Sequence, residues 1–164
     1  MAQLLLLERP FSPAFVSELG ALVRSIFGEL DAPTAQLSVN DVFLSDLEWR
    51  LAEMPAASVH AGIADGHLVG FKFGYAIGRT RYLSWLGGVA SSHRRQGIAR
   101  ALLERQHAWA AQKGFGMIET GTTNTNAAML TLNLAAGFEV IGSYARDATP
   151  RVVLQKRLLP PRIT

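Results

Sequence analysis

The stretch from residue 82 to residue 103 constrains this chain more than any other part of it. Its first eight residues, 82–89, form a short run that is rich in the aromatic and aliphatic residues favoured by strands. A loop follows, and from Gly97 onward the sequence is an Ala- and Leu-rich helix. The first turn of a helix has N–H groups without intrahelical partners and carries partial positive charge. Strand, loop and helix N-terminus in this order therefore predict a pocket for a phosphate or pyrophosphate.

The side chains of the loop support the same prediction. Gly97 and Ala99 let a ligand approach the backbone because they carry little or no side chain. Arg94, Arg95 and Arg100 add positive charge around the same place. A phosphate cradle is therefore preferred to a loop that merely contains a glycine.

These residues resemble a known motif. Arg94-x-x-Gly97-x-Ala99, after a strand that ends in Val89, is similar to the acyl-CoA-binding motif of the GNAT superfamily of N-acetyltransferases, which reads Arg/Gln-x-x-Gly-x-Gly/Ala. A motif with so few fixed positions is a weak signal when it stands alone. A second block of sequence is needed to support it.

That second block lies between residues 119 and 138. In the family an Asn opens a later helix that ends in Gly-Phe, and here Asn126 and Gly137-Phe138 have that spacing. The two blocks come in the order expected for the family, with one helix and one strand between them. The resemblance is specific over 89–138 and follows the order of elements over about 3–158.

Hydrophobic periodicity and turn residues predict the order β-α-α-β-β-β-α-β-α-β-β along the chain. Asp65-Gly66 predicts a type I′ hairpin turn, and the strand–helix–strand unit after residue 82 predicts a parallel strand pair. The resemblance implies one α/β domain over 1–164, with a GNAT-type mixed, mostly antiparallel sheet of about seven strands and about four flanking helices. The expected strands are 3–8, 58–63, 68–77, 82–89, 116–122, 138–144 and 151–156, and the expected helices run from Pro13 to Gly28, from Asp41 to just before Pro55, from Gly97 to Gln112 and from Asn126 to Ala136.

The resemblance also implies a co-substrate, acetyl-CoA, and the residues that hold it. In the family the pantetheine arm lies between two diverging strands and pairs with one of them. The residues that match the family's contacts are Val89 for pantetheine, Arg95, Gln96, Gly97, Ile98 and Ala99 for pyrophosphate, Arg94 and Arg100 flanking it, and Asn126 and Asn133 for the distal pantetheine and the sulfur.

The chain departs from the family at its acid and base positions. Many members have a tyrosine that protonates the leaving thiolate, and that position is Asn133 here, whose amide cannot deliver a proton. Two positions that carry a glutamate base in other members are Leu83 and Gly121 here. Our hypothesis is direct attack by the acceptor amine, with its proton lost through water or a polar group, and with Asn133 positioning the leaving sulfur.

Composition excludes several other classes of protein. Hydrophobic residues make up 49% of the chain and charged residues 18%, which is typical of a globular protein. The absence of cysteine excludes disulfides, thiolate zinc sites and a cysteine nucleophile. No histidine spacing predicts a metal site, and the apolar runs are too short to span a bilayer. We therefore expect a cytoplasmic enzyme without a metal or a membrane partner.

Several residues have two interpretations. Asn126 is predicted equally well as a ligand contact or as a helix cap. Glu119 is assigned a structural role in preference to a catalytic one, since it alternates away from its neighbours on the strand. His60 is expected to be a satisfied structural histidine and His107 a surface residue. Trp49, Trp85 and Trp109 are expected in the core, and Asp46 and Glu48 on an exposed helix face, although a cationic acceptor would suit them.

Two rival functions stay open. One is a module that binds acyl-CoA without catalysis, which the missing acid and base residues favour. The other is a nucleic-acid binder that uses the basic residues 94–105, but the net charge of only +3 and the uninterrupted helical pattern argue against it. We expect no nucleic-acid partner, and the acceptor is a small-molecule or peptide amine that no motif identifies. A homodimer is common in the family.

Overall fold

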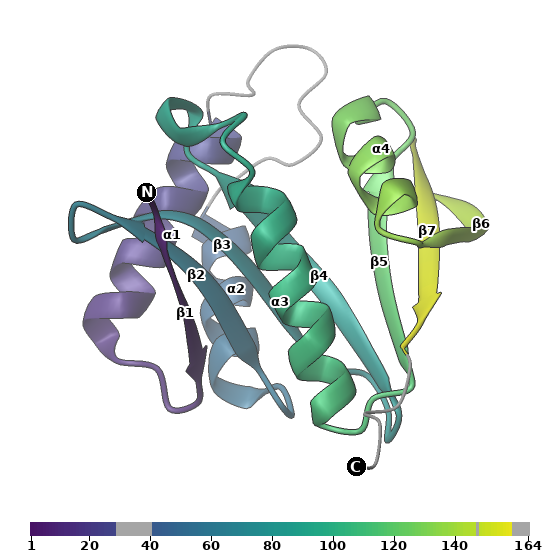
Figure 1. Ribbon diagram of the computed structural model, residues 1–164, viewed down its shortest axis with the longest axis horizontal. Coiled ribbons are helices and arrows are strands. Elements are labelled where there is room, and N and C mark those ends of the chain that lie inside the picture. Colours follow the sequence, from purple (N-terminus) through teal and green to yellow (C-terminus); the bar gives the residue numbers. More distant parts are fainter. Residues whose placement is uncertain (29–40, 147, 159–164) are drawn as a thin grey trace.

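The computed structural model describes residues 1–28, 41–146 and 148–158. Seven strands form one sheet in the order β1-β2-β3-β4-β5-β7-β6, with helices on both faces (Figure 1). The elements in chain order are β1 (Gln3–Glu8), α1 (Pro13–Gly28), α2 (Asp41–Glu53), β2 (Ser58–Ala64), β3 (His67–Ala76), β4 (Arg81–Val89), the 3-10 turn η1 (Ser91–His93), α3 (Ile98–Gln112), β5 (Met117–Thr123), α4 (Ala127–Ala135), β6 (Glu139–Arg146) and β7 (Thr149–Arg157).

The helices divide between the two faces of the sheet. In Figure 1 α3 and α4 lie in front of the strands, and α1 and α2 lie behind them. The apolar stripes predicted for α1 and α2 are buried: Leu19 and Val23 on α1 and Leu47 and Leu51 on α2 are 0 to 1% exposed. These side chains share one core cluster with Phe71 and Phe73 of β3. Helical spacing of apolar residues therefore predicted the covered face correctly.

The local turn and cap signals are confirmed. Asp65 and Gly66 have φ values of +50° and +79°, as a type I′ turn requires. Ser12 Oγ accepts a hydrogen bond from the N–H of Phe15 at 3.2 Å, which caps α1. Asn40, the predicted cap of α2, lies outside the described residues.

The sheet is mixed as predicted, because β4 and β5 are parallel and the other neighbouring strands are antiparallel. The sequence did not predict that β7 lies between β5 and β6. The expected strands 138–144 and 151–156 leave Pro150 in the connection between them, and this was wrong. It lies on β7, paired with Ala145 of β6.

Candidate functional site: the opening between β4 and β5

The sheet opens between β4 and β5. The two strands pair in parallel only over the first part of each, ending at the pair Ser84 and Thr120. β4 continues to Val89 with β3 as its neighbour, while β5 stays paired with β7. The strands diverge in Figure 1, with β4 on one side and β5 on the other. The closed end of this opening lies at Ser84 and Thr120.

A bulge bends β4 at that point. The register between β3 and β4 shifts between the pairs Phe73–Leu86 and Gly74–Ser84, so Trp85 has no residue directly opposite it. An extra residue on one strand bends that strand and increases its twist. Because the bulge follows Ser84 directly, it explains why β4 leaves β5 there.

Backbone groups of β4 point into the opening. The N–H of Ala90 donates to the carbonyl oxygen of Val69 at 2.8 Å, which makes these two residues a hydrogen-bonded antiparallel pair. Such pairs alternate with non-hydrogen-bonded ones, whose N–H and C=O groups point away from the partner strand. Gly87 and Val89 fall on the non-hydrogen-bonded positions of the ladder with β3. Their backbone groups therefore face the side from which β5 has diverged.

The predicted anion loop lies at the open end of β4. Gly97 is the N-cap residue of α3, with φ of +80°, and Arg95 also has a positive φ of +63°. No side chain among the described residues caps the helix, and the N–H groups of its first turn lack intrahelical partners. A Cβ at residue 97 would meet no atom within 4 Å. Glycine is thus required here for its backbone conformation, and no described residue fills the space next to it.

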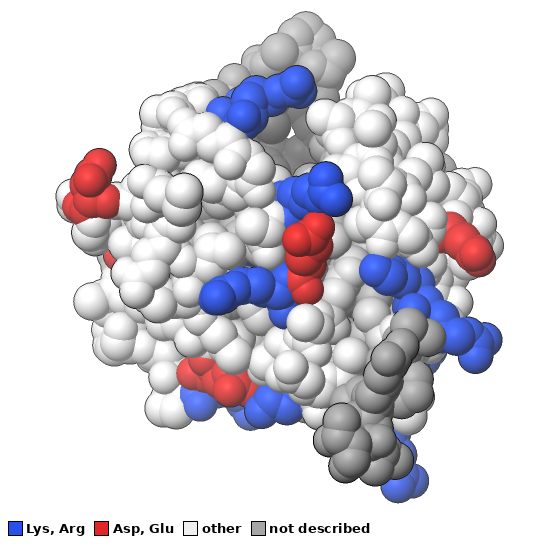
Figure 2. Space-filling view, viewed as in Figure 1, with Lys and Arg blue, Asp and Glu red and all other residues white. Residues whose placement is uncertain are grey.

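The basic side chains of the loop have different surroundings. Arg94 Nε donates to the carbonyl oxygen of Val89 at 3.1 Å, so this guanidinium braces the end of β4. Arg100 pairs with Glu104 at 2.9 Å on the exposed face of α3, while Arg95 is exposed. Figure 2 shows basic side chains above the N-terminal end of α3 and a hollow in the surface between that end and α4.

On α4, one predicted site residue is a cap and the other is buried without a partner. Asn126 Oδ1 accepts a hydrogen bond from the N–H of Met129 at 3.2 Å. Asn126 therefore caps α4 through this oxygen. Asn133 is 1% exposed, and neither its Oδ1 nor its Nδ2 has a hydrogen-bond partner among the described residues. A buried amide without partners is costly. A ligand group that reached Asn133 would remove this cost.

The structure brings the other predicted residues to one end of the opening. Ile98 packs with Val89 and Leu102 in one apolar cluster, which fixes the start of α3 against β4. The loop from Arg94 to Gly97 lies between them in the chain. Asn126 and Asn133 belong to α4, on the β5 side of the opening (Figure 1).

On the opposite face of the sheet, α2 covers the bulge. The Arg50 guanidinium carbon lies 4.5 Å from the centre of the Trp85 ring, and Phe43 stacks on the same ring at 5.7 Å. Arg50 also donates to Asp46 Oδ2 at 2.7 Å and to the hydroxyl of Tyr75. Asp46 was predicted on an exposed helix face. It is only partly exposed, and its carboxylate is paired with Arg50. Apart from its aromatic residues, nothing in the sequence indicates this cluster.

Buried polar residues lie on the α3 face of the sheet. His107 was predicted on the surface of α3, and this was wrong: it is 7% exposed, and its Nδ1 lies 3.2 Å from Lys156 Nζ. Burial, and secondly the charge of Lys156, lowers the pKa of His107 to about 3. His60 is 2% exposed, with Nε2 unpartnered among the described residues, and burial followed by the charge of Arg105 lowers its pKa to about 4. It is structural, as expected, but it is not satisfied.

Two further predictions have clear outcomes. Glu119 is structural: its Oε1 accepts from Arg81 Nε at 2.8 Å and from Gln155 Nε2 at 3.1 Å. Trp109 is buried at 7% exposure, but Trp49 is 55% exposed and does not belong to the core.

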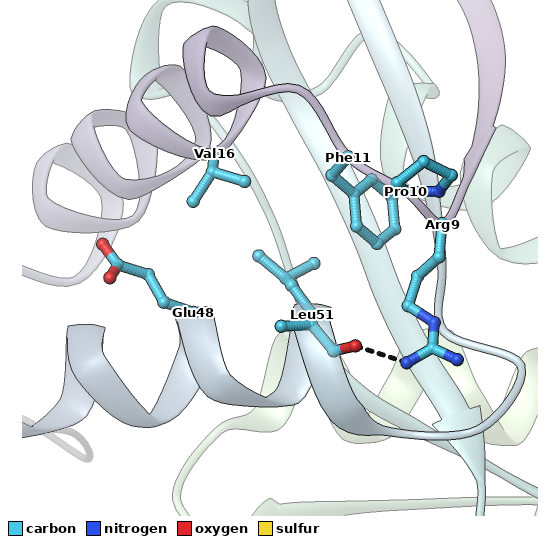
Figure 3. A pocket seen from close by; sticks show the side chains of 7 residues that line it. Arg9, Pro10, Phe11, Val16, Glu48 and Leu51 are labelled. Atoms are coloured by element: carbon cyan, nitrogen blue, oxygen red, sulfur yellow. Dashed lines mark hydrogen bonds between the residues drawn. The ribbon is translucent and has the colours of Figure 1, made fainter.

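A separate cavity of about 450 Å³ lies between α1 and α2 (Figure 3). Phe11, Val16 and Leu51 form its apolar walls, and Arg9 and Glu48 line it at its edges. It is not part of the site at Val89. The cavity adjoins the end of β1, whereas the start of β1 packs near Val89.

The part of the chain that the structure describes holds no group of three or more His, Asp or Glu side chains arranged to bind a metal ion. None of its helices is both long enough and apolar enough to cross a bilayer.

Comparison with known proteins agrees with this geometry. The model of the acetyltransferase (GNAT) family matches residues 26–138. Among curated proteins, no sequence matches this chain. Similar solved structures include a GNAT-family protein from Desulfovibrio desulfuricans, with a TM-score of 0.75, 15% identity and coverage of 96% of this chain and 100% of that one.

Two other similar structures have a named substrate. The ribosomal-protein-alanine N-acetyltransferase from Brucella melitensis has a TM-score of 0.73 and 22% identity, and the match covers 94% of this chain and 99% of that one. The ribosomal-protein-S18-alanine N-acetyltransferase from Escherichia coli has a TM-score of 0.73 and 13% identity, with 99% of both chains covered. At these identities the likeness concerns the fold.

Proposed function

The chain belongs to the GNAT family of acetyltransferases, and on that basis we propose that it transfers an acetyl group from acetyl-CoA to an amine of an acceptor. One observation carries the proposal. The opening between β4 and β5 ends at an uncapped helix N-terminus, so unpaired strand backbone leads directly to an anion site. We propose further that residues 1–164 form one acyltransferase domain.

The residues around the opening suit this co-substrate. The Gly87 and Val89 backbone would pair with the pantetheine arm as a neighbouring strand would. The N–H groups from Arg95 to Ala99 would hold the pyrophosphate, with the charges of Arg94 and Arg100 beside it. The unpartnered amide of Asn133 supports a position beside the distal pantetheine and the sulfur, whereas Asn126 would act chiefly by capping α4.

The protein's part in the reaction is mainly positioning. Acetyl-CoA supplies an activated acetyl thioester with a good leaving group. The N–H of Gly87 or Val89 would polarise the thioester carbonyl, since both point into the opening. The backbone on either side would hold the acceptor amine against that carbonyl for direct attack. Water or a polar group would take the proton that the amine loses.

The first acceptor to test is the α-amine of a peptide N-terminus. Two of the similar structures are named as ribosomal-protein-alanine N-acetyltransferases. The face of the bulge that α2 covers carries a partly exposed carboxylate, Asp46, beside Arg50 and Trp85. Because Asp46 is paired with Arg50, this pair adds no net charge and does not identify the acceptor. Small-molecule amines form the second class of acceptor.

A second function, acyl-CoA binding without catalysis, is favoured by one observation. Asn133, Leu83 and Gly121 occupy the positions of the acid and the two bases found in other members of the family. A binding module predicts a tight complex with acetyl-CoA and no release of thiol with any amine.

Thiol release separates the two functions. The purified chain would be incubated with acetyl-CoA and a panel of peptides with different N-terminal residues, together with small amines, and free CoA thiol would be measured over time. The proposed function predicts acceptor-dependent release and a product that is heavier by one acetyl group. Saturable binding of acetyl-CoA without acceptor-dependent release across both panels would favour the binding module.

Cytoplasmic localisation and a homodimer stay predictions.

A further inference from the structure

A buried lysine, Lys72, lies next to the opening. Lys72 lies on β3, directly opposite His60 on β2 and Gly87 on β4. It is 8% exposed. No hydrogen bond or ion pair joins it to any residue that the structure describes. Since a buried lysine is rare unless its charge is paired, Lys72 calls for an explanation.

The glycine opposite Lys72 gives its side chain a path toward the opening. A Cβ at residue 87 would lie 2.8 Å from Lys72 Cδ, closer than real Cβ atoms approach a neighbour. The lysine side chain therefore lies over Gly87, in space that a Cβ at residue 87 would occupy. The amine extends two bonds beyond Cδ. The next strand on that side would be β5, but β5 has diverged from β4 before this level.

Lys72 and the backbone of Gly87 thus meet at the same part of the opening. Residue 87 occupies a non-hydrogen-bonded position of the β3–β4 ladder, so its N–H points toward the opening as well. In such pairs the opposite side chains approach each other most closely. A group held against the Gly87 N–H would have the Lys72 amine beside it.

Among the residues that the structure describes, none compensates the charge of Lys72. His60 faces it from β2, His107 lies on α3, and burial lowers the pKa of both below neutrality, so both are neutral at pH 7. Lys156 on β7 is engaged by His107 and by the carbonyl oxygen of Ala136. Burial lowers the pKa of Lys72 itself to about 8. At neutral pH it is still mainly an ammonium ion, and an anion in the opening would stabilise it.

We propose that Lys72 is a catalytic residue that donates a proton to the leaving CoA sulfur, the role that a tyrosine fills in other members of the family and that Asn133 cannot fill here. The proposal rests on the proposed function. The acceptor nitrogen forms a bond to the carbonyl carbon, the carbon–sulfur bond breaks, and the sulfur takes the proton from the Lys72 ammonium. The neutral Lys72 amine then takes up, through water, the proton that the acceptor nitrogen loses. No other reactant is needed.

The proposal makes a prediction about CoA binding that does not depend on an acceptor. A cation within hydrogen-bonding reach lowers the pKa of a thiol by about 1 to 3 units. The ionisation of the bound CoA thiol is followed by the ultraviolet absorbance of the thiolate from pH 6 to 9, with the complex of desulfo-CoA, which lacks the thiol, as the blank. The variant is Lys72→Met, which keeps the length of the side chain and removes its charge. The matched control is Lys113→Met, which removes a half-exposed lysine that pairs with Glu8.

The wild type and Lys113→Met are expected to bind CoA with the thiol pKa lowered by about 1 unit or more. In Lys72→Met the thiol should ionise at or above the pH of free CoA. Lys72→Met should also fold, because it replaces a buried charge by an apolar group of similar length; circular dichroism and thermal unfolding check this. Lys72→Arg would keep the charge but could not give up a proton. In Lys72→Arg the pKa of the bound CoA thiol should stay lowered, and the rate of acceptor-dependent turnover should fall tenfold or more.

Four outcomes would overturn the proposal. If the bound thiol ionises at the same pH in the wild type and in folded Lys72→Met, Lys72 does not act on the sulfur. If Lys72→Met loses affinity equally for CoA and for desulfo-CoA, the lysine holds the pantetheine arm instead. If the wild type binds neither compound, the proposed function fails together with this inference, whereas normal CoA binding with an unshifted thiol overturns the inference alone.

Discussion

The hydroxyl of Thr120 donates a hydrogen bond to the carbonyl oxygen of Ser84 at 3.0 Å, across the last pair of the parallel ladder between β4 and β5. Both residues are buried, with exposures of 5% and 1%. The bond lies where the two strands begin to diverge, so it closes the narrow end of the opening. The position of this bond sets the depth to which a ligand can enter.

Removal of the Thr120 hydroxyl should loosen the closed end of the opening. Thr120→Val keeps the shape of the side chain but leaves the Ser84 carbonyl oxygen without this partner, which should lower the free energy of unfolding by about 1 to 3 kcal/mol. Chemical denaturation measures this loss, and titration calorimetry should show weaker CoA binding. Thr131→Val, on the exposed face of α4, is the control and should change both quantities little. Equal effects of the two substitutions would contradict a special role for Thr120.

A side chain at residue 97 should impair both folding and binding. Gly97→Ala forces a non-glycine residue to adopt a φ of +80°, which costs about 1 to 2 kcal/mol. The added methyl group also enters the open space in front of the first turn of α3. CoA affinity, measured by calorimetry on the folded fraction, should therefore fall. Gly116→Ala, at a glycine that has equal space and no positive φ, should retain wild-type affinity. CoA affinity unchanged by Gly97→Ala would argue against the loop as the pyrophosphate site.

Substitution of Asn133 should separate stability from ligand response. Asn133→Leu replaces a buried amide, unpartnered among the described residues, by an apolar group of similar size. The free energy of unfolding of the ligand-free protein should rise by about 1 to 3 kcal/mol, which is the cost of a buried amide without hydrogen bonds. The increase in melting temperature on adding CoA should become smaller than in the wild type. A variant that is less stable, with an undiminished CoA response, would show that Asn133 is part of the packing and not of the site.

Stability should fall with acid because of the buried histidines. The pKa of His60 is about 4 and that of His107 about 3 in the folded protein, against 6.5 for an unperturbed histidine. Between these values the unfolded chain binds more protons than the folded one, so the free energy of unfolding falls as the pH decreases from about 6.5 toward 4. Denaturant titrations at pH 7 and pH 5 measure the loss. His60→Gln should reduce it, and the exposed-residue variant His67→Gln should not; equal losses in both variants would exclude His60 as a source.

The local structure could largely be predicted from the sequence. The Asp65-Gly66 turn, the glycine before α3 and the parallel pair of β4 and β5 each follow from a short pattern whose physical cause acts within a few residues. The strand, the turn and the start of α3 could be predicted for the same reason, because they are contiguous in the chain; anion binding there stays a prediction.

The parts that were missed depend on contacts between distant segments. The place of β7 between β5 and β6 is decided by packing across the whole sheet. The burial of His107 involves Lys156 of β7 and the ring of Phe138 between α4 and β6, which contact a helix face that looks polar in sequence. Lys72 interrupts the apolar pattern of β3, and Gly87 interrupts that of β4. A glycine within a strand signals close approach of another group, but only the strand register shows that the approaching group is Lys72.

The most direct test of the account is thermal unfolding in the presence of acetyl-CoA, CoA, ATP or inorganic pyrophosphate, each added separately at high concentration. A ligand at about a hundred times its dissociation constant adds roughly 2.7 kcal/mol to the free energy of unfolding. The account predicts a clear rise in melting temperature with acetyl-CoA and with CoA, and little or none with ATP, because ATP cannot use the backbone of Gly87 and Val89. An unchanged melting temperature with all four would contradict the assignment of the opening as an acyl-CoA site.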